Sequence, residues 1–474
     1  MIIEKILKVS PVIWMVGIAI LIFFACSSFR HALFQSGAFD LGFFDNALYL
    51  ISQGQRPFVV FNSIHILGDH AAYLLYILAL LYKIVPDVHW LFAVQAVALA
   101  LGAMPTFYLA NEAGLNKAQA VAMAAVYLLY PLVFNVNLFD FHPEVMALPA
   151  ILAAVLAARL GRIGWFCLCI IVILGCKAVL SLTVAAMGLW LLVFEKRRLY
   201  GAIALSAGVA WFLIATQVIL PTFGVNQPTA VGRYTYLGNS LLEIVKNLLL
   251  QPEIVFSRIF TPVNFGYLLL LVSPVIWGLS PRYITPLLGA IPTLFLNLIT
   301  DYRPQKDLIH HYSVPILPFL LLAVIANLAA GGGWLRSRRL IILWALVAFL
   351  ALAKYNFFWS KYLSSLDNWQ ASREAIDYIR TQEGVLTTDA IAPHLTHRSV
   401  VKLVTKDLDS IDFSQVKYIL LNVRHPGGDA PHKSVKTLFY RLKQTPEFQI
   451  IYERDHVFLF EPQPPRIPLP RVAF

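Results

Sequence analysis

The sequence predicts an α-helical polytopic membrane protein with about eleven spans, followed by a small α/β domain outside the cytoplasm. Of the 474 residues, 59% are hydrophobic and only 13% are charged, and the mean hydropathy is +0.69. A soluble protein with a single core would not have so high a fraction of hydrophobic residues and so few charged ones. Apolar runs continue to residue 360, and short alternating segments then take their place. We therefore predict a transmembrane domain at 1–360 and an α/β domain at 361–474.

The charges fit a membrane protein. The net charge is +11, but the basic residues stand in short clusters between apolar runs, where they act as topology signals or contact anionic lipid. No basic and aromatic surface module is visible, so we expect no nucleic-acid partner. The four cysteines lie in apolar runs and indicate neither a disulfide framework nor a zinc site.

The first span is predicted at Val12–Phe29, after Lys5 and Lys8 and without an obvious cleavage site, which favours a cytoplasmic N-terminus. The run Ala71–Val85 would reach only about 22 Å as a helix, short of the roughly 30 Å hydrocarbon core, so we expect it to lie in the interface. Further spans are expected at about His89–Ala110, Ala118–Phe134, Val145–Ala158, Ile163–Cys176, Ala178–Phe194, Leu199–Leu220, Phe265–Leu279, Tyr283–Ile299, Val314–Ala330 and Leu340–Phe357.

The positive-inside rule tests this topology. The predicted cytoplasmic loops carry Lys117, Arg159 with Arg162, Lys196 to Arg198, Arg282, and Arg336 with Arg338 and Arg339, as the rule requires. A full span at Ala71–Val85 would invert this order through most of the chain. The expected orientation is N-terminus inside and C-terminal domain outside.

The polar loops on the outer side hold most of the candidate chemical groups. The stretch Ser36–Tyr49 follows the first span and carries Asp40 and Asp45. Acids near lipid are costly unless they face water, a partner or a substrate. The alternative is an interfacial helix whose acids face solvent.

Other candidates also have structural alternatives. Asp69 with His70 could cap the next helix, and Glu144 after Pro143 suits a helix first turn. His310 and His311 could form an interfacial belt with Tyr312. Lys177, between two short apolar runs, could extend its ammonium group toward the headgroups.

These residues carry a resemblance. Asp40, the Gly-Asp-His-Ala stretch from Gly68, Asp-Phe-His-Pro-Glu from Asp140, Lys177 and His-His-Tyr-Ser-Val-Pro from His310 resemble an uncharacterised prokaryotic family of predicted multi-pass membrane proteins. That family is similar to the GT-C glycosyltransferases, and the likeness spans about residues 10 to 460. Ala178 and Val179 follow Lys177, where the family often has an acidic pair.

The resemblance implies a glycosyltransferase in the prokaryotic cytoplasmic membrane that uses a sugar on a polyprenyl phosphate and an extracytoplasmic acceptor. Asp40 stands where the catalytic acid of the first outside loop is expected. Carboxylates with imidazole also suit Mg or Mn, although no metal site is assigned. Substrate contacts are expected from Asp45, Asp69, His70, Asp140, His142, Glu144, Lys177 and Arg233. Phosphate contacts are expected from Arg303, Lys306, His310, His311 and Tyr312.

Two other functions stay open. A noncatalytic envelope protein that binds a lipid-linked glycan would keep the basic residues, and a transporter would use the same charges in an intramembrane path. A transporter would favour inverted repeats, and no convincing repeat is visible.

The C-terminal stretch alternates between helix and strand patterns. Helices are expected at Trp369–Arg380 and Ser434–Lys443, and strands at Gly384–Thr388, Val400–Val404, Val416–Asn422 and within Phe448–Phe460. No Gly-rich phosphate-binding fingerprint opens a helix here, so no nucleotide is expected. The Pro-rich tail Pro462–Pro470 is expected to be extended.

Overall fold

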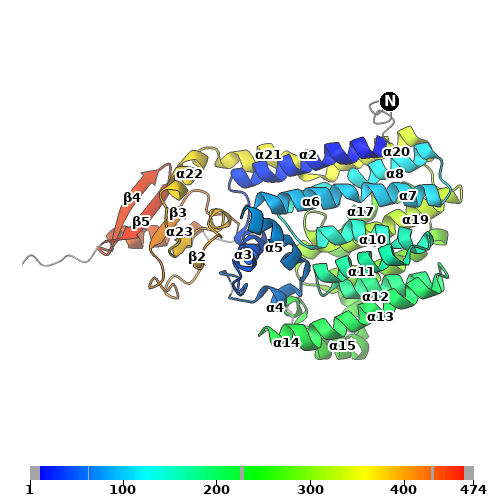
Figure 1. The fold of residues 1–474 in the computed structure, drawn as a ribbon, viewed down its shortest axis with the longest axis horizontal. Helices are drawn as coiled ribbons and strands as arrows, with labels where there is room; N and C mark the ends of the chain where they lie inside the picture. The colour runs from blue at the N-terminus through cyan, green and yellow to red at the C-terminus, as the bar shows by residue number, and fades with distance from the viewer. Residues whose placement is uncertain (1–10, 62, 225–228, 429–431, 464–474) are drawn as a thin grey trace, which may run out of the picture. The chain divides into compact units, whose positions relative to one another are not determined.

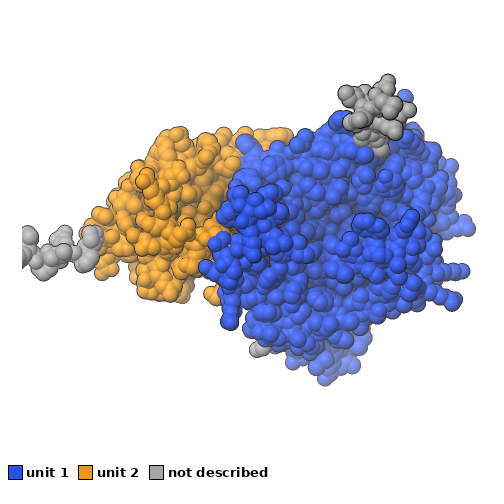
Figure 2. Space-filling view, in the orientation of Figure 1, with its two compact units in different colours: residues 1–29, 51–58, 64–357 blue, residues 30–50, 59–63, 358–474 orange. Residues whose placement is uncertain are grey.

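The structure, a computed structural model, describes residues 11–61, 63–224, 229–428 and 432–463 (Figure 1). The chain forms two compact units (Figure 2). Unit 1 comprises residues 1–29, 51–58 and 64–357, and unit 2 comprises residues 30–50, 59–63 and 358–474. The N-terminal segment Met1–Ser10 and most of the Pro-rich tail lie outside the described residues.

Unit 1 is helical. Its longer helices are α2 (Pro11–Ala32, whose last turn belongs to unit 2), α5 (Leu74–Ile84), α6 (His89–Leu101), α7 (Ala103–Glu112), α8 (Lys117–Leu128), α9 (Pro131–Phe139), α10 (Glu144–Arg159), α11 (Ile163–Cys176), α12 (Leu180–Val193), α13 (Arg198–Ile214), α15 (Leu241–Leu250), α16 (Pro252–Ile259), α17 (Pro262–Val272), α18 (Ile291–Ile299), α19 (Leu317–Ala329) and α20 (Arg338–Leu352). Short helical turns join them, among them α4 (Ile66–His70), α14 (Leu220–Thr222), η3 (Thr229–Tyr234), η6 (Thr285–Ala290), η7 (Arg303–Lys306) and η8 (His311–Ile316).

Five helices of the described residues are long and apolar enough to cross a membrane, or seven if each of two bent helix pairs counts as one span. The estimate of about eleven spans is therefore not confirmed. Several predicted spans form shorter apolar helices, such as Ile163–Cys176 and Leu180–Val193, below the about 20 residues that a straight span needs. The run predicted to lie in the interface contains α5, which at 1.5 Å per residue is only about 17 Å long.

Two spans form the interior of unit 1. The segments Lys117–Phe139 and His311–Ala329 are each 83% buried, whereas Pro11–Ala32 is 28% buried. Glycines let α12 and α13 approach each other closely, because a Cβ added at Gly201 would lie 2.6 Å from the Leu192 nitrogen. Small residues at such contacts are typical of membrane helix packing.

Unit 2 is built on a five-stranded sheet in the order β2-β1-β3-β5-β4. The strands are β1 (Val385–Thr387), β2 (Val401–Leu403), β3 (Tyr418–Asn422), β4 (Phe448–Arg454) and β5 (Val457–Pro462). Strand β1 pairs in parallel with β2 and β3, and β5 pairs antiparallel with β3 and β4. The turn between β4 and β5 has positive φ at Asp455 and His456, as a tight hairpin turn of the type I′ kind requires.

Alternate residues of β3 build two cores, because successive strand side chains point to opposite faces. Ile419 and Leu421 join one core with α23 (His432–Gln444). Leu420 joins the other core with α22 (Trp369–Asp377) and with Phe34 from the stretch after α2. The predicted helices and strands of the C-terminal stretch are thus confirmed, with ends that shift by a few residues.

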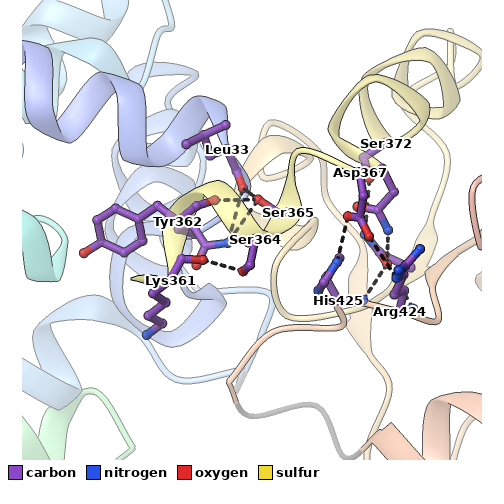
Figure 3. A network of polar contacts seen from close by, with 12 residues as sticks. Leu33, Lys361, Tyr362, Ser364, Ser365, Asp367, Ser372, Arg424 and His425 are labelled. Carbon is purple, nitrogen blue, oxygen red and sulfur yellow. Dashed lines mark hydrogen bonds and ion pairs between the residues drawn. The ribbon is translucent and has the colours of Figure 1, made fainter. Parts of the chain in front are cut away.

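Polar contacts tie the stretch after α2 into unit 2. The Ser365 hydroxyl donates to the carbonyl of Leu33, which follows α2, at 2.8 Å (Figure 3). Elsewhere in unit 2, Asp367 accepts from Arg424 and His425 at 2.8 and 2.9 Å (Figure 3). Unit 2 also contains η1 (Ala38–Gly42), most of α3 (Phe43–Ser52), α21 (Phe357–Ser360, from its second residue), η10 (Tyr362–Ser365) and η11 (Ala392–His394).

Candidate functional site

A buried ion pair lies at the start of α10. Glu144 is the first residue of this helix, as its position after Pro143 predicts. Its Oε1 lies 2.5 Å from the Nζ of Lys177, which stands in extended backbone between α11 and α12. The Glu144 side chain is 5% exposed and that of Lys177 20%. The proposal that Lys177 merely extends toward the headgroups is therefore wrong, because its ammonium group neutralises a buried acid.

Two histidines stack beside this pair. The rings of His142 and His311 lie with their centroids 3.9 Å apart, and His311 Nε2 lies 3.5 Å from Glu144 Oε1. Phe139 also stacks on His142, with the two ring centroids 5.1 Å apart, and its centroid lies 6.0 Å from that of His311. His311 is only 5% exposed, so the alternative of an interfacial belt does not hold for this histidine. We call Glu144, Lys177, His142 and His311 the buried cluster.

The buried cluster has unused hydrogen-bonding capacity. Glu144 Oε2 and His311 Nδ1 are buried and have no hydrogen-bond partner among the described residues. A buried polar atom without a partner costs about 1–3 kcal/mol. Such atoms are retained where a bound group or water satisfies them.

Asp140 contacts the cluster through its backbone carbonyl, which lies 3.4 Å from His142 Nδ1. It ends α9 with φ +103°, a conformation that non-glycine residues rarely adopt. His142 follows two residues later, and its backbone N–H donates to Gln95 Oε1 at 3.3 Å. The Gln95 amide donates to the Asn137 carbonyl at 3.1 Å. Gln95 thus fixes the turn between α9 and α10, and its place as a polar residue within an apolar run is the sequence signal for it.

A second group of residues surrounds Arg233, and it includes the predicted site residue Tyr312. Its guanidinium donates to Gln305 Oε1 and to the Tyr312 hydroxyl, both at 3.1 Å. The same group lies over the rings of Tyr302 and Tyr312, at 4.5 and 4.9 Å from their centroids. Gln305 was not singled out in the sequence, where nothing in its loop distinguishes it.

The remaining predicted phosphate ligands differ in their environments. Lys306 Nζ donates to the Leu298 carbonyl at 3.0 Å, and burial lowers the pKa of Lys306. His310 Nδ1 lies 2.7 Å from Asp307 Oδ2, which holds its ring in place. Arg303 is exposed. These side chains follow one another along η7 and the start of η8.

Asp69 and His70 lie in α4. Asp69 Oδ2 is 2.5 Å from His70 Nδ1, and the His70 carbonyl accepts from the Ala178 N–H at 2.9 Å. The alternative that Asp69 caps the following helix is wrong, because Tyr73 is the N-cap of α5 and no side chain caps it. The contact with Ala178 places this loop next to the residue that follows Lys177.

The two acids of the first loop belong to unit 2. Asp40 is half-buried in η1, whose start is held by a 2.9 Å hydrogen bond from the Ala38 N–H to Asp389. Asp45 is 1% exposed, and its carboxylate accepts from Thr396 and lies 3.1 Å from His397 Nε2. Asp45 therefore contacts the C-terminal part of unit 2.

Asp140, His142 and Glu144 combine carboxylates with an imidazole, a set of side chains that could orient an acceptor or suit Mg or Mn. Within residues 11–61, 63–224, 229–428 and 432–463, no three His, Cys, Asp or Glu side chains are grouped closely enough to hold a metal ion. Glu144 is instead committed to Lys177.

Comparisons with known proteins give a family and a fold. The model of the family described as "Predicted membrane protein (DUF2079)" matches residues 30–459, and no curated protein sequence matches the chain. Of the solved structures, ArnT from Cupriavidus metallidurans bound to undecaprenyl phosphate is similar with a TM-score of 0.53 and 12% identity, over 95% of this chain and 97% of that chain. The apo oligosaccharyltransferase of Archaeoglobus fulgidus has a TM-score of 0.45 and 13% identity, over 88% of this chain and 70% of that chain. The resemblance to an uncharacterised family of predicted membrane proteins is confirmed, and the fold is similar to that of ArnT.

Proposed function

The chain belongs to the DUF2079 family of predicted membrane proteins, and we propose that it is a GT-C-type glycosyltransferase. It transfers a sugar from a polyprenyl-phosphate donor to an acceptor outside the cytoplasm. ArnT, whose fold this chain shares over 95% of its length, is bound to undecaprenyl phosphate in its solved structure, which supports a donor of that class.

The buried cluster carries the proposal. Its four residues come from three separate parts of unit 1: Glu144 with His142, Lys177, and His311. Each of them contacts another member of the cluster within 4 Å. Ionisable groups inside a membrane domain are expensive, and they are kept where they bind substrates or ions. The unpartnered atoms Glu144 Oε2 and His311 Nδ1 are suited to hydroxyl groups of a sugar, which donate and accept hydrogen bonds.

The reaction needs a base and cations. Asp40 takes the proton of the acceptor hydroxyl as its oxygen forms a bond to the anomeric carbon of the donor sugar. The bond between that carbon and the phosphate oxygen breaks, and its electron pair stays on the phosphate. The products are the glycosylated acceptor and the polyprenyl phosphate.

The cations of η7 and η8 stabilise the leaving phosphate in this proposal. Arg303 is exposed and can bind phosphate through two nitrogens. Lys306 and His310 follow it at part-buried positions, and Tyr312 holds Arg233 through its hydroxyl. Charge that develops on the phosphate is most strongly stabilised by donors that are already fixed in place.

We extend the proposal to topology. The chain crosses the membrane about eleven times with its N-terminus in the cytoplasm, and the shorter apolar helices complete the spans. The basic loops support this orientation, since each falls on the cytoplasmic side of that arrangement.

The test uses the full chain in proteoliposomes with a panel of radiolabelled polyprenyl-phosphate sugars and envelope extract as acceptor. We expect label to move from the lipid to a water-soluble or envelope product. Binding of the labelled lipid without transfer would support a noncatalytic glycan-binding protein instead. Label that crosses the bilayer chemically unchanged would support a transporter.

A further inference from the structure

A cavity of about 440 Å³ lies in unit 2 beside β2, which is an edge strand of the sheet. Its volume falls within the roughly 300–1,000 Å³ that is usual for small-molecule sites. One wall is β2 with the loop that follows it, and the other wall is Phe39, Val60 and Phe61 from the first loop. None of these residues has a role in the chemistry described above.

The charged side chains that line the cavity have no net charge. Two lysines, Lys402 and Lys406, and two aspartates, Asp389 and Asp412, line the cavity. Lys402 Nζ lies 3.1 Å from Asp412 Oδ2. Hydrogen bonds from Ser414 and Lys402 lower the pKa of Asp412 to about 2, so this acid is ionised at neutral pH. A wall of zero net charge suits a neutral polar molecule better than an anion, which would need an excess of cations.

The wall also combines rings with hydrogen-bonding groups. Phe39 is 47% exposed, and its ring centroid lies 6.2 Å from that of Phe61. Aromatic faces pack against the C–H groups of a pyranose ring, while its hydroxyls need donors and acceptors. Lys406 lines the cavity and can donate. The hydroxyls of Thr405 and Ser410 donate to the Asp407 carbonyl, both at 2.8 Å, and keep their oxygens as acceptors. The lining therefore fits a neutral sugar.

The cavity is fixed to the turn that carries Asp40. Phe39 lines it and directly precedes Asp40 in η1. Asp389, which also lines the cavity and is buried, accepts a hydrogen bond from the Ala38 N–H at 2.9 Å. Gly42 ends the same turn, and a Cβ there would lie 3.0 Å from the ring of Phe61. Cavity and turn thus form one packed structure within unit 2.

We infer that this cavity is the acceptor subsite, and that it holds a neutral sugar unit of a glycan acceptor next to Asp40. The inference rests on the proposed function, because an acceptor is expected only if the chain transfers sugar. It names the acceptor class, a carbohydrate, which the proposed reaction leaves open.

The test measures binding of methyl glycosides of hexoses and N-acetylhexosamines to the full chain in nanodiscs by saturation-transfer NMR, without donor. Glycerol phosphate serves as an anionic probe. The variants are Phe61→Ala and Lys406→Ala, and the matched control is Tyr440→Ala. Tyr440 is 62% exposed on α23 and is not part of the cavity wall.

We expect at least one glycoside to bind, with affinity about tenfold weaker in both cavity variants and unchanged in the control. Lys406 is exposed, so its variant reports on binding even if Phe61→Ala does not fold. Equal binding by all variants, binding of glycerol phosphate in place of the glycosides, or no glycoside binding would each overturn the inference.

A second measurement separates this inference from the proposed function. If the chain transfers sugar and the cavity variants keep the parental acceptor KM, the subsite is wrong and the transferase stands. If glycosides bind in a cavity-dependent way but no donor yields transfer, the transferase is wrong and the cavity remains a sugar-binding site.

Discussion

Lys177 Nζ lies 2.5 Å from Glu144 Oε1, inside a unit made almost entirely of apolar helices. The two residues are 33 positions apart in the sequence. Their attraction offsets the cost of removing a carboxylate from water only while both partners are present. The consequences of breaking the pair are therefore asymmetric.

Lys177→Met alone should destabilise the protein by about 3 kcal/mol, because Glu144 would be left as an uncompensated buried charge. The double variant Lys177→Met/Glu144→Gln should recover most of this stability and yet transfer no sugar. Thermal melting of each variant in detergent measures its stability, and the proteoliposome assay measures its sugar transfer. The matched control is the ion pair between Arg159 and Glu195, 2.9 Å long: neutralising both partners should leave transfer intact. Full transfer by the Lys177 double variant would contradict a functional role for the cluster.

The sequence predicted the elements of unit 2 well, because each strand and helix shows its own local pattern, as in Val416–Asn422. It did not predict that residues 30–50 pack into the same unit. The hydrogen bond from Asn46 to the Thr396 carbonyl, 2.7 Å long, joins residues 350 positions apart. Such a contact leaves no periodicity in either segment, so local patterns cannot reveal it.

The candidate site shows the same limit. The predicted residues Glu144, Lys177, His142 and His311 do meet. Each stands at or next to a helix end, between α9 and α10, between α11 and α12, or at the start of η8. Their pairing was not predictable, since Glu144 could equally have faced His70 or solvent. The number of membrane spans was harder to predict than the site residues. Hydropathy gives the length of an apolar run, but prolines and bends set the length of the helix within that run.

Arg233→Lys should lower stability by about 1–2 kcal/mol. A lysine cannot donate to both Gln305 and Tyr312 in the planar geometry of a guanidinium, and it stacks less well on Tyr302. Thermal melting of the purified variant measures the change. Arg441→Lys is the control, because Arg441 pairs with Asp409 at side chains that are 53% and 88% exposed, where ion pairs contribute little. Equal effects of the two substitutions would show that the Arg233 contacts are not special.

Gly201→Ala should destabilise unit 1 by about 2 kcal/mol, because the new methyl group would lie 2.6 Å from the Leu192 nitrogen and force α12 away from α13. Gly266→Ala in α17 makes the matched comparison. Nothing lies within 4 Å of a Cβ at Gly266, so this variant should melt at or above the parental temperature. The packing of α12 on α13 would be in question if both variants melted alike.

The proposed topology predicts which side of the membrane each unit meets. In a chain whose native cysteines are replaced by serine, Lys436→Cys on α23 should react with an impermeant thiol reagent in intact cells. Lys117→Cys, at the start of α8, should react only after the membrane is opened. Both positions are exposed in the structure. The reverse pattern of labelling would invert the orientation and place Asp40 in the cytoplasm.

Asp40→Asn should fold and insert normally but transfer sugar about 10²- to 10⁴-fold more slowly, the usual effect of removing a positioned general base. The substitution keeps the shape of a half-buried side chain, and the turn that carries it is held by backbone groups. The Ala38 N–H bonds to Asp389, and the Gly42 N–H donates to the Gly37 carbonyl at 3.1 Å. Melting temperature and binding of the labelled donor should therefore stay at parental values while the rate falls.

Asp45→Asn is the control for this prediction, five residues along the same loop. Its carboxylate is 1% exposed and is bound by Thr396 and His397, so its neutralisation should lower the melting temperature by weakening charge-assisted contacts. The transfer rate of the folded fraction should change far less than in Asp40→Asn. A parental rate for Asp40→Asn would remove the base from the mechanism and favour a glycan-binding protein. Equal loss of rate in both variants would mean that the loop acts through its packing, since only Asp40 is assigned a proton.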